Sequence, residues 1–277
     1  MKKIKKLRKI FNQYNLDGYI IPKNNSFFGE YVSASEDNLK YISDFTGSSG
    51  FAIILKNKNL MFVDGRYTTQ ATIQCGKDYK IFTIPKHYPF NVFNNKNLNL
   101  GFDPKLHTEN SLKKLFKNSF IKLKPINKNL IDLLWKRKKD LYIKPFYLIK
   151  DQHAGEKFEN KLVKLRKLII LNKVDYLFTT APENVAWLLN IRGHDTNYSP
   201  LPNSHAFIGR NNEIVLFCNL KKINKSLKSK LNKKIKFCDI DQLPIFIANL
   251  SNKKILIDIL TCSIFFKTLI NRKNLII

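Results

Sequence analysis

The chain carries Leu7-Arg8-Lys9-Ile10 followed by Asp17-Gly18-Tyr19-Ile20-Ile21, and a related pattern returns later as Leu165-Arg166-Lys167-Leu168 followed by Asp175-Tyr176-Leu177-Phe178. Both blocks recur at an offset of 158 residues (7 to 165 and 17 to 175), so the spacing between them is unchanged. In each copy, apolar residues at helical spacing precede a short apolar run, which predicts an amphipathic helix followed by a buried strand. The chain is therefore predicted to contain a diverged internal repeat.

Two further blocks extend the repeat. Tyr41-Ile42-Ser43-Asp44-Phe45-Thr46-Gly47 matches Trp187-Leu188-Leu189-Asn190-Ile191-Arg192-Gly193, and Leu60-Met61-Phe62-Val63-Asp64 matches Val215-Leu216-Phe217-Cys218-Asn219. The offset drifts here, which indicates loops of different length. Blocks in the same order in both halves predict two tandem α/β units, residues 1–150 and 151–277.

Hydrophobic periodicity and turn residues predict the elements of each half. Expected helices span residues 4–14, 66–75, 109–116 and 130–135, and then 156–171 and 183–189. Expected strands span residues 19–22, 51–55, 60–63, 79–84, 98–102 and 120–123, and then 175–179, 205–208 and 214–217. Two more helix and strand units are expected before the apolar end Leu275-Ile276-Ile277, which predicts that the chain is cut short.

The formal net charge of +28 raises the possibility of nucleic-acid binding. Only 7 of the 49 basic residues are Arg, however, and Arg is the residue that forms bidentate phosphate and guanine contacts. Lys, Asn, Ile, Phe and Tyr, which have A/T-rich codons, are enriched together. A biased genome therefore explains the composition without an acidic partner, and a nucleic-acid-associated protein stays an alternative.

Length and composition predict a globular protein. The 277 residues are 44% hydrophobic, but no apolar run approaches the roughly 20 residues that span a bilayer. The basic N-terminus is not followed by an apolar signal core, so we expect a cytoplasmic protein without membrane attachment. The four cysteines, Cys75, Cys218, Cys238 and Cys262, stand far apart and are expected to be reduced and structural.

Motifs for hydrolysis, metal binding or phosphate binding are absent from the sequence. It contains no HExxH, GxSxG, GxxxxGK[ST] or GxGxxG. The five histidines lie on separate predicted elements or loops, and only His194 and His205 share a local segment. The sequence therefore predicts no catalytic residue and no metal ligand.

One candidate binding segment is Asp64-Gly65-Arg66-Tyr67, between the predicted hairpin and the helix that follows it. Asp64 can cap the first helical turn and Gly65 allows a tight turn, so both are expected to be structural. Arg66 is expected either in a local ion pair or reaching out to an anionic group. The nearby Gly47-Ser48-Ser49-Gly50 could form an anion-binding nest, but a flexible turn is the favoured interpretation.

A second candidate is the loop that begins Arg192-Gly193-His194-Asp195 and runs to Pro200-Leu201-Pro202. Long polar loops in compact domains are more often functional than short ones. We expect this loop either to form part of a binding surface or to be a structural connection in which Gly193 has a backbone role.

Taken together, these segments resemble the aminopeptidase P family, the Xaa-Pro aminopeptidases. The resemblance is carried by stretches at residues 17–22, 30–31, 41–50, 64–67, 130–135, 154–156 and 185–193. Their order and spacing agree over essentially the whole chain, which is more specific than any single motif.

The resemblance implies two tandem creatinase-like N-terminal domains, each an α/β domain with a mixed sheet flanked by helices. In the family these are followed by a pita-bread catalytic domain with two metal ions, usually manganese, bound by Asp, His and Glu. Those ligands would lie in a portion absent from this sequence, so no cofactor is expected here. Arg66, Tyr67, Arg192, His194 and Asp195 become candidates for side chains that face the substrate cleft.

The expected function is that of the N-terminal, non-catalytic portion of a metal-dependent enzyme that removes the residue before a proline. Such a portion would restrict access to the cleft and aid assembly. Its implied partners are a catalytic domain in cis or in trans, peptides with proline at the second position, and other copies of the chain in a homo-oligomer. A stand-alone peptide- or protein-binding module remains an alternative.

Overall fold

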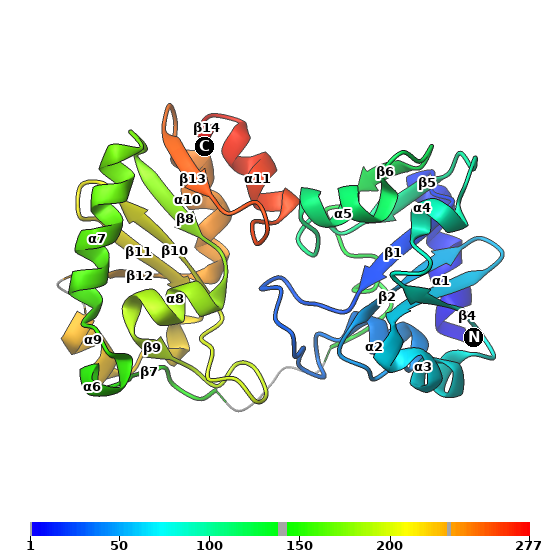
Figure 1. The fold of residues 1–277 in the computed structure, drawn as a ribbon, viewed down its shortest axis with the longest axis horizontal. Helices are drawn as coiled ribbons and strands as arrows, with labels where there is room; N and C mark the ends of the chain where they lie inside the picture. The colour runs from blue at the N-terminus through cyan, green and yellow to red at the C-terminus, as the bar shows by residue number, and fades with distance from the viewer. Residues whose placement is uncertain (1, 138–142, 232–233) are drawn as a thin grey trace. The chain divides into compact units, whose positions relative to one another are not determined.

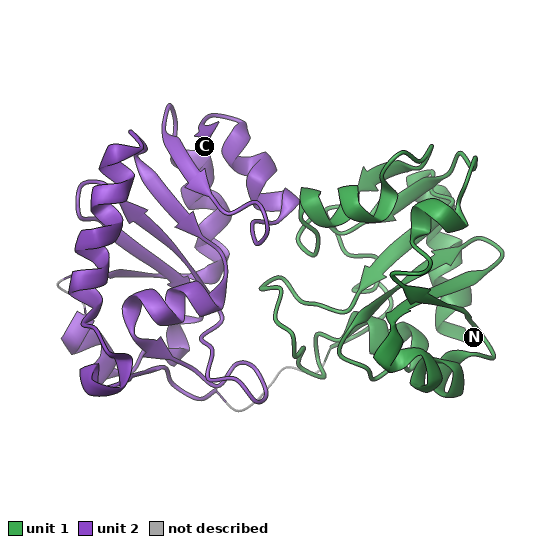
Figure 2. Ribbon diagram, viewed as in Figure 1, with its two compact units in different colours: residues 1–139 green, residues 140–277 purple. Residues whose placement is uncertain are grey.

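The computed structural model describes residues 2–137, 143–231 and 234–277 (Figure 1). The chain divides into two compact units, residues 1–139 and residues 140–277 (Figure 2). Each unit is an α/β domain built around a six-stranded mixed sheet. The predicted fold class, two tandem α/β domains with mixed sheets flanked by helices, is confirmed.

Among its described residues, 2–137, unit 1 contains one sheet, five α-helices and two short 3₁₀ helices. Its strands are β1 (Gly18–Pro22), β2 (Gly50–Leu55), β3 (Asn59–Asp64), β4 (Lys80–Ile84), β5 (Asn99–Phe102) and β6 (Lys122–Pro125). Its helices are α1 (Lys2–Phe11), α2 (Asn38–Ser43), α3 (Thr68–Cys75), α4 (Pro89–Val92) and α5 (Glu109–Phe116), with 3₁₀ turns η1 (Asn12–Tyr14) and η2 (Gly65–Tyr67).

Unit 2 repeats this plan with a small additional ribbon. Its sheet contains β8 (Tyr176–Thr179), β10 (Ser204–Gly209), β11 (Ile214–Cys218), β12 (Lys236–Asp239), β13 (Lys254–Ile257) and β14 (Leu275–Ile276). Its helices are α6 (Asp151–Ala154), α7 (Phe158–Leu171), α8 (Pro182–Leu189), α9 (Lys225–Leu231), α10 (Leu243–Asn249) and α11 (Ile264–Asn271), with η3 (Leu220–Lys222) and η4 (Ile240–Gln242). The ribbon pairs β7 (Tyr147–Leu148) with β9 (Ile191–Arg192).

The two sheets have the same topology. Their strand orders are β4-β3-β2-β1-β5-β6 and β12-β11-β10-β8-β13-β14. In both, the central strand (β1 or β8) pairs antiparallel with the hairpin (β2–β3 or β10–β11) on one side and parallel with the next strand (β5 or β13) on the other. The edge strands pair parallel in both units. The repeat seen in the sequence is therefore a repeat of structure.

An aspartate precedes the central strand of unit 1 and ties together three chain segments. Asp17 N donates to Asn99 O at 2.8 Å, and Asn99 N donates to Asp17 Oδ2 at 2.9 Å. Lys56 N, just beyond β2, donates to Asp17 O at 3.1 Å, while Lys56 Nζ lies 3.0 Å from Asp17 Oδ1. One residue thus connects β1 to both of its neighbours.

Unit 2 reproduces this arrangement with Asp175. Asp175 N donates to Lys254 O and Lys254 N donates to Asp175 Oδ2, both at 2.8 Å. Arg210 N donates to Asp175 O at 3.0 Å. The block Asp17-Gly18-Tyr19 was matched to Asp175-Tyr176-Leu177 from sequence, and the hydrogen bonds agree with that alignment.

The segment between the first helix and the central strand also repeats. Asn15 and Lys173, again 158 residues apart, both adopt left-handed backbone conformations with φ of 51° and 53°. The following residues, Leu16 and Val174, then donate to the carbonyl five positions earlier at 3.0 and 3.2 Å. These bonds satisfy carbonyls at the helix C-terminus in the manner of a Schellman turn.

Apolar residues cover each sheet on the face that receives α1 and α2 in unit 1 and α7 and α8 in unit 2. In unit 1, Leu7 and Phe11 of α1 and Ile42 of α2 belong to one buried cluster with strand residues such as Ile54. In unit 2, α7 and α8 contribute to the corresponding cluster, and α10 and α11 contribute to a second one that includes Phe178 and Phe217. Burial on this scale is the main stabilising term of such units.

Two predicted elements of unit 1 differ from the structure. Residues 130–135 form successive turns and not a helix, because Asn129 Oδ1 accepts from Ile131 N at 2.9 Å and the segment is held by contacts with other elements. The strand predicted at residues 120–123 is observed two residues later, as β6 (Lys122–Pro125). Pairing with β5 sets Lys122 opposite Asn99, and Phe120 lies before the strand and is 66% exposed. Tertiary contacts override local pattern in both places.

Membrane insertion receives no support from the helices. Within the described ranges, none combines the length and apolar character that a bilayer span requires.

We expect Asp17→Asn to lower the free energy of unfolding by about 1 kcal/mol at pH 7, the difference between a charge-assisted and a neutral hydrogen bond. The Asn99 N–H, with help from Lys56, holds the pKa of Asp17 below its ordinary value. The contribution is therefore present above the unfolded-state pKa of about 3.9 and is lost as pH falls through the lower folded-state pKa. Urea unfolding at pH 7 and near pH 3 measures this, and a stability gap that does not narrow in acid contradicts it.

Candidate functional site

Asp64, Arg66 and Tyr67 form a polar corner at the end of β3. Asp64 Oδ1 accepts from Arg66 N at 2.9 Å, as a cap of η2, and Asp64 Oδ2 lies 2.7 Å from Arg66 Nη2. The side-chain hydrogen bond from Arg66 lowers the pKa of Asp64, and the same bond raises the pKa of Arg66. The guanidinium carbon lies 5.4 Å from the Tyr67 ring centroid, and the side chain is 75% exposed. The corner thus presents an oriented guanidinium to solvent.

The glycines next to this corner allow close packing. A Cβ on Gly47 would lie 2.3 Å from Phe45 Cζ and 2.8 Å from Tyr67 Cδ1. Gly50 begins β2 with φ of 155°, and its Cβ would lie 2.9 Å from Phe62 O. A Cβ on Gly65, in contrast, would meet nothing within 4 Å. Gly47 therefore lets Tyr67 pack against Phe45, and the Tyr67 hydroxyl lies 2.8 Å from Ser48 Oγ.

In unit 2, Arg192 and Asp195 hold the ends of the candidate loop in place. The Arg192 guanidinium donates to Ala186 O at 2.7 Å and to Ile191 O at 3.0 Å. The Asp195 side chain is only 5% exposed, accepts from Asn203 N at 2.7 Å and forms an ion pair with Lys222. Both side chains are engaged with the protein itself.

Gly193 and His194 lie between these two anchors. A Cβ on Gly193 would lie 2.8 Å from Leu201 O, because the backbone segments at the two ends of the loop pass close together there and leave no room for a larger residue. His194 is exposed, with its ring centroid 5.4 Å from that of Tyr147. Of the loop residues predicted as candidates, His194 is the one that presents its side chain to solvent.

The structure therefore brings the candidates together in two groups, each within one unit. Arg66 and Tyr67 are neighbours in unit 1, and Arg192, His194 and Asp195 are neighbours in unit 2. The side chains of Arg66 and His194 are accessible.

Unit 1 also contains a polar pocket of about 220 Å³ that the sequence analysis missed. Asp103 and Asn129 lie at its base, where Asn129 Nδ2 donates to Asp103 Oδ2 at 2.9 Å. Burial raises the pKa of Asp103. Arg137 closes one side by donating to Ser35 O and Asn38 Oδ1, each at 2.7 Å. An aspartate directly after a strand in both halves, Asp103 and Asp258, was the available sequence signal.

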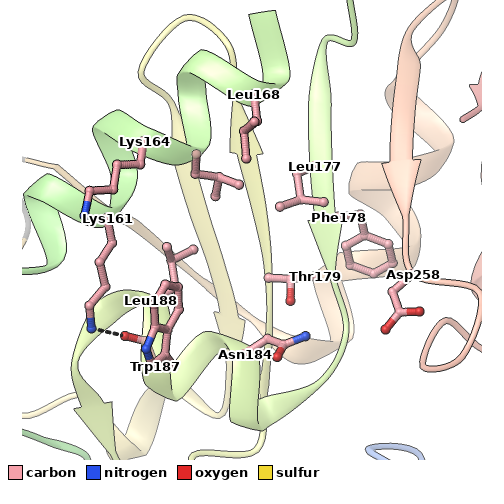
Figure 3. Close-up of a pocket in the computed structure, with 11 residues that line it drawn as sticks. Lys161, Lys164, Leu168, Leu177, Phe178, Thr179, Asn184, Trp187, Leu188 and Asp258 are labelled. Atoms are coloured by element: carbon pink, nitrogen blue, oxygen red, sulfur yellow. Dashed lines mark hydrogen bonds between the residues drawn. The ribbon is translucent and has the colours of Figure 1, made fainter. Parts of the chain in front are cut away.

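Unit 2 contains an apolar pocket of about 340 Å³ between α7 and α8 (Figure 3). Leu168 from α7, Leu177 from β8 and Trp187 from α8 line it, with Asp258 at one end. Lys161 Nζ donates to Trp187 O at 2.8 Å. Leu168 and Trp187 are 55% and 59% exposed, so this is an open apolar surface of the unit.

Metal binding is not supported by the donors in this part of the protein. Among the described residues, no group of three His, Cys, Asp or Glu side chains is placed to hold an ion. Burial lowers the pKa of His107 to about 3 and that of His205 to about 4, so both imidazoles are neutral at pH 7. The donor set in the described ranges therefore does not fit the manganese pair that the resemblance implies for a catalytic domain.

The cysteines are also unsuited to nucleophilic chemistry. All four are free, and Cys75, Cys218 and Cys262 are buried. Burial raises the pKa of Cys75 to about 11 and that of Cys218 and Cys262 to about 12. Since the thiolate is the reactive form, these side chains are inert packing residues at neutral pH.

Comparison with family models gives a match in each half of the chain. Residues 3–132 and residues 137–277 each match a model described as the creatinase/prolidase N-terminal domain. The two matches together span most of both structural units.

Curated relatives include a probable Xaa-Pro aminopeptidase P from Coprinopsis cinerea, 29% identical over 87% of this chain and 40% of its own length. Aminopeptidase P1 from Lotus japonicus is 30% identical over 78% of this chain and 34% of its own length. The chain thus spans well under half the length of these relatives.

Among solved structures, the X-prolyl aminopeptidase of Caenorhabditis elegans superimposes with a TM-score of 0.89 and 24% sequence identity. The match covers 99% of this chain and 49% of that one. That protein is described as a cytosolic enzyme with a di-nuclear active site. The similarity supports a common fold.

We expect Asp195→Ala to lower the free energy of unfolding of unit 2 by roughly 3 kcal/mol, because it leaves Lys222 without its ion-pair partner in a mostly buried position. His194→Ala, in the same loop but exposed, should change it by less than about 0.5 kcal/mol. Urea denaturation monitored by circular dichroism measures both. Equal effects of the two substitutions would contradict the anchoring role of Asp195.

Proposed function

The chain belongs to the creatinase/prolidase N-terminal family, and on that premise we propose that it is the non-catalytic N-terminal portion of a metal-dependent Xaa-Pro aminopeptidase. The observation that carries this proposal is the tandem match, one family domain in each structural unit over most of the chain. The curated relatives named above are Xaa-Pro aminopeptidases or aminopeptidases P, which supports the assignment of peptides with proline at the second position as substrates.

The chemistry of hydrolysis belongs, in this proposal, to a portion outside the present sequence. The chain covers 34–40% of the two curated relatives, so most of their length has no counterpart here. Two divalent ions, manganese or similar, would be bound by a catalytic domain that acts with this chain in cis or in trans.

The two units would restrict access to the cleft and assist assembly, including the formation of homo-oligomers. Arg66 suits a substrate-facing role because Asp64 orients its guanidinium while leaving the side chain 75% exposed. His194 suits such a role because it is exposed on a loop that Arg192 and Asp195 hold in shape. A cytosolic location is part of the proposal and is supported by the description of the C. elegans relative.

We expect the purified chain, supplied with Mn²⁺, to hydrolyse Xaa-Pro peptides no faster than Mn²⁺ alone. Fusion of the C-terminal portion of the C. elegans relative after Ile277 should produce activity, because that portion would supply the missing ligands. Release of the N-terminal amino acid, followed by chromatography, measures both proteins. Hydrolysis by the isolated chain would contradict the non-catalytic assignment.

In that active fusion, Arg66→Ala should lower kcat/KM for Xaa-Pro peptides by about tenfold, the order lost with one charge-assisted hydrogen bond to substrate. Arg210→Ala is the matched control, because Arg210 is an exposed arginine in the β10–β11 turn of unit 2. Initial rates at several substrate concentrations give kcat/KM for each protein. An Arg66→Ala value equal to that of the control would remove Arg66 from the substrate-facing surface.

A further inference from the structure

The matching topologies of the two units allow each residue that lines the apolar α7–α8 pocket to be compared with an equivalent in unit 1. Leu177 lies 158 residues after Tyr19, at the offset of the repeat, and each stands two residues after the aspartate that precedes its strand. The registers agree with this correspondence, because Tyr19 pairs with Ile54 and Gly101 as Leu177 pairs with Ile208 and Leu256. The same registers place Asp258 and Asp103 at corresponding positions after β13 and β5, where each side chain accepts from the N–H two residues later.

Helix α8 corresponds to α2 in the same way. Trp187 aligns with Tyr41 in the repeat, and Asn184 aligns with Asn38. Lys161 Nζ lies 4.6 Å from the Trp187 ring, and Lys3 Nζ lies 4.8 Å from the Tyr41 ring, so even the cation over the aromatic face is reproduced.

In unit 1, the chain itself covers this surface with residues 126–137. Leu130 N donates to Tyr19 Oη at 3.4 Å, and Trp135 stacks on Tyr41 with ring centroids 4.7 Å apart. Ile126, Leu130 and Ile131 are buried in the same cluster as α1 and α2.

The polar ends of the covering segment use the equivalent positions as well. Asn129 Nδ2 donates to Asp103 Oδ2 at 2.9 Å, and Arg137 Nη2 donates to Asn38 Oδ1 at 2.7 Å. Four residues that line the pocket of unit 2 therefore correspond to four that residues 126–137 contact in unit 1.

In unit 2, the corresponding surface has no such cover among the described residues. Tyr19 is 1% exposed, but its counterpart Leu177 is only partly buried and Trp187 is 59% exposed. The groove contains about 340 Å³ and is lined mainly by apolar atoms of α7, β8 and α8 (Figure 3). A surface of this kind marks an interaction site.

The position of β14 indicates what would occupy the groove. The registers place Leu275 opposite Lys254 and Lys122 opposite Asn99, so Leu275 corresponds to Lys122. Ile277 then corresponds to Lys124, two residues before the covering segment of unit 1 starts at Ile126. Any polypeptide continuing from Ile277 would begin at the place from which unit 1 covers its own groove.

We propose that the α7–α8 groove is the docking site of a polypeptide segment joined to Ile277, folded back as residues 126–137 are in unit 1. The segment would place apolar side chains over Leu177, an aromatic ring on Trp187 and an amide donor at Asp258. This proposal rests on the internal repeat and holds whether or not a peptidase domain follows. The alternative occupant is a second copy of the chain, and the experiment below distinguishes the two occupants.

The test appends residues with the sequence of 125–137 directly after Ile277, with tyrosine in the place of Trp135 so that no further tryptophan is added to the emission. The control carries the same segment with serine at six of its apolar positions, those of Ile126, Leu130, Ile131, Leu133, Leu134 and Trp135. Trp187→Phe versions of each protein allow the emission of the native Trp135 to be subtracted. Acrylamide quenching then reports the exposure of Trp187.

We expect the appended segment to lower the quenching constant of Trp187 by about twofold or more, because stacking removes its open face from solvent. The serine control should leave the quenching constant as it is in the 277-residue chain. Equal quenching in the extended and unextended proteins would overturn the proposal. A second result would also overturn the proposal. If the protection of Trp187 in the unextended chain increased with the fraction of dimer measured by analytical ultracentrifugation, a second copy of the chain would be the occupant.

Discussion

In each unit, an aspartate forms hydrogen bonds at the start of the central strand, where the pairing changes from antiparallel on one side to parallel on the other. The central strand has an antiparallel neighbour on one side and a parallel neighbour on the other, so its first backbone groups cannot be satisfied by a single continuing ladder. Asp17 and Asp175 supply the missing partners through their own N–H, C=O and carboxylate. Each aspartate thereby joins the central strand to its neighbours on both sides, β2 and β5 in unit 1 and β10 and β13 in unit 2.

The same constraint explains how much of the fold could be predicted from sequence. The strand and helix signals around Asp17 and Asp175 are local, and the 158-residue offset preserved them, so the duplicated α/β plan was readable. Residues 130–135 were not, because their turns are determined by contacts with Tyr19, Asp103 and Tyr41, which lie far away in the chain. The strand expected at residues 120–123 was displaced by its pairing with β5 for the same reason.

The candidate site residues divide along a similar line. Sequence identifies an Asp-Gly-Arg-Tyr corner and a long polar loop, but it does not say which side chains are used internally. Asp195 lies in a polar segment of the sequence, yet its side chain is only 5% exposed and pairs with Lys222. Arg66 pairs with Asp64, two residues earlier in the chain, and its side chain stays 75% exposed. That distinction depends on which partner is close in space, and an ion pair with a near neighbour in sequence leaves the arginine at the surface.

The repeat also makes one unit informative about the other. Two copies of a fold share the faces that need burial, so a face covered in one copy shows how the same face can be covered in the other. Unit 1 covers this face with residues 126–137, and in unit 2 Ile277 corresponds to Lys124, two residues before the start of that cover. Since the lysine over the aromatic ring is retained in both units, the surface of α7 and α8 keeps the form of a docking face. The two units have therefore kept the same pairing of a lysine and an aromatic ring on this face.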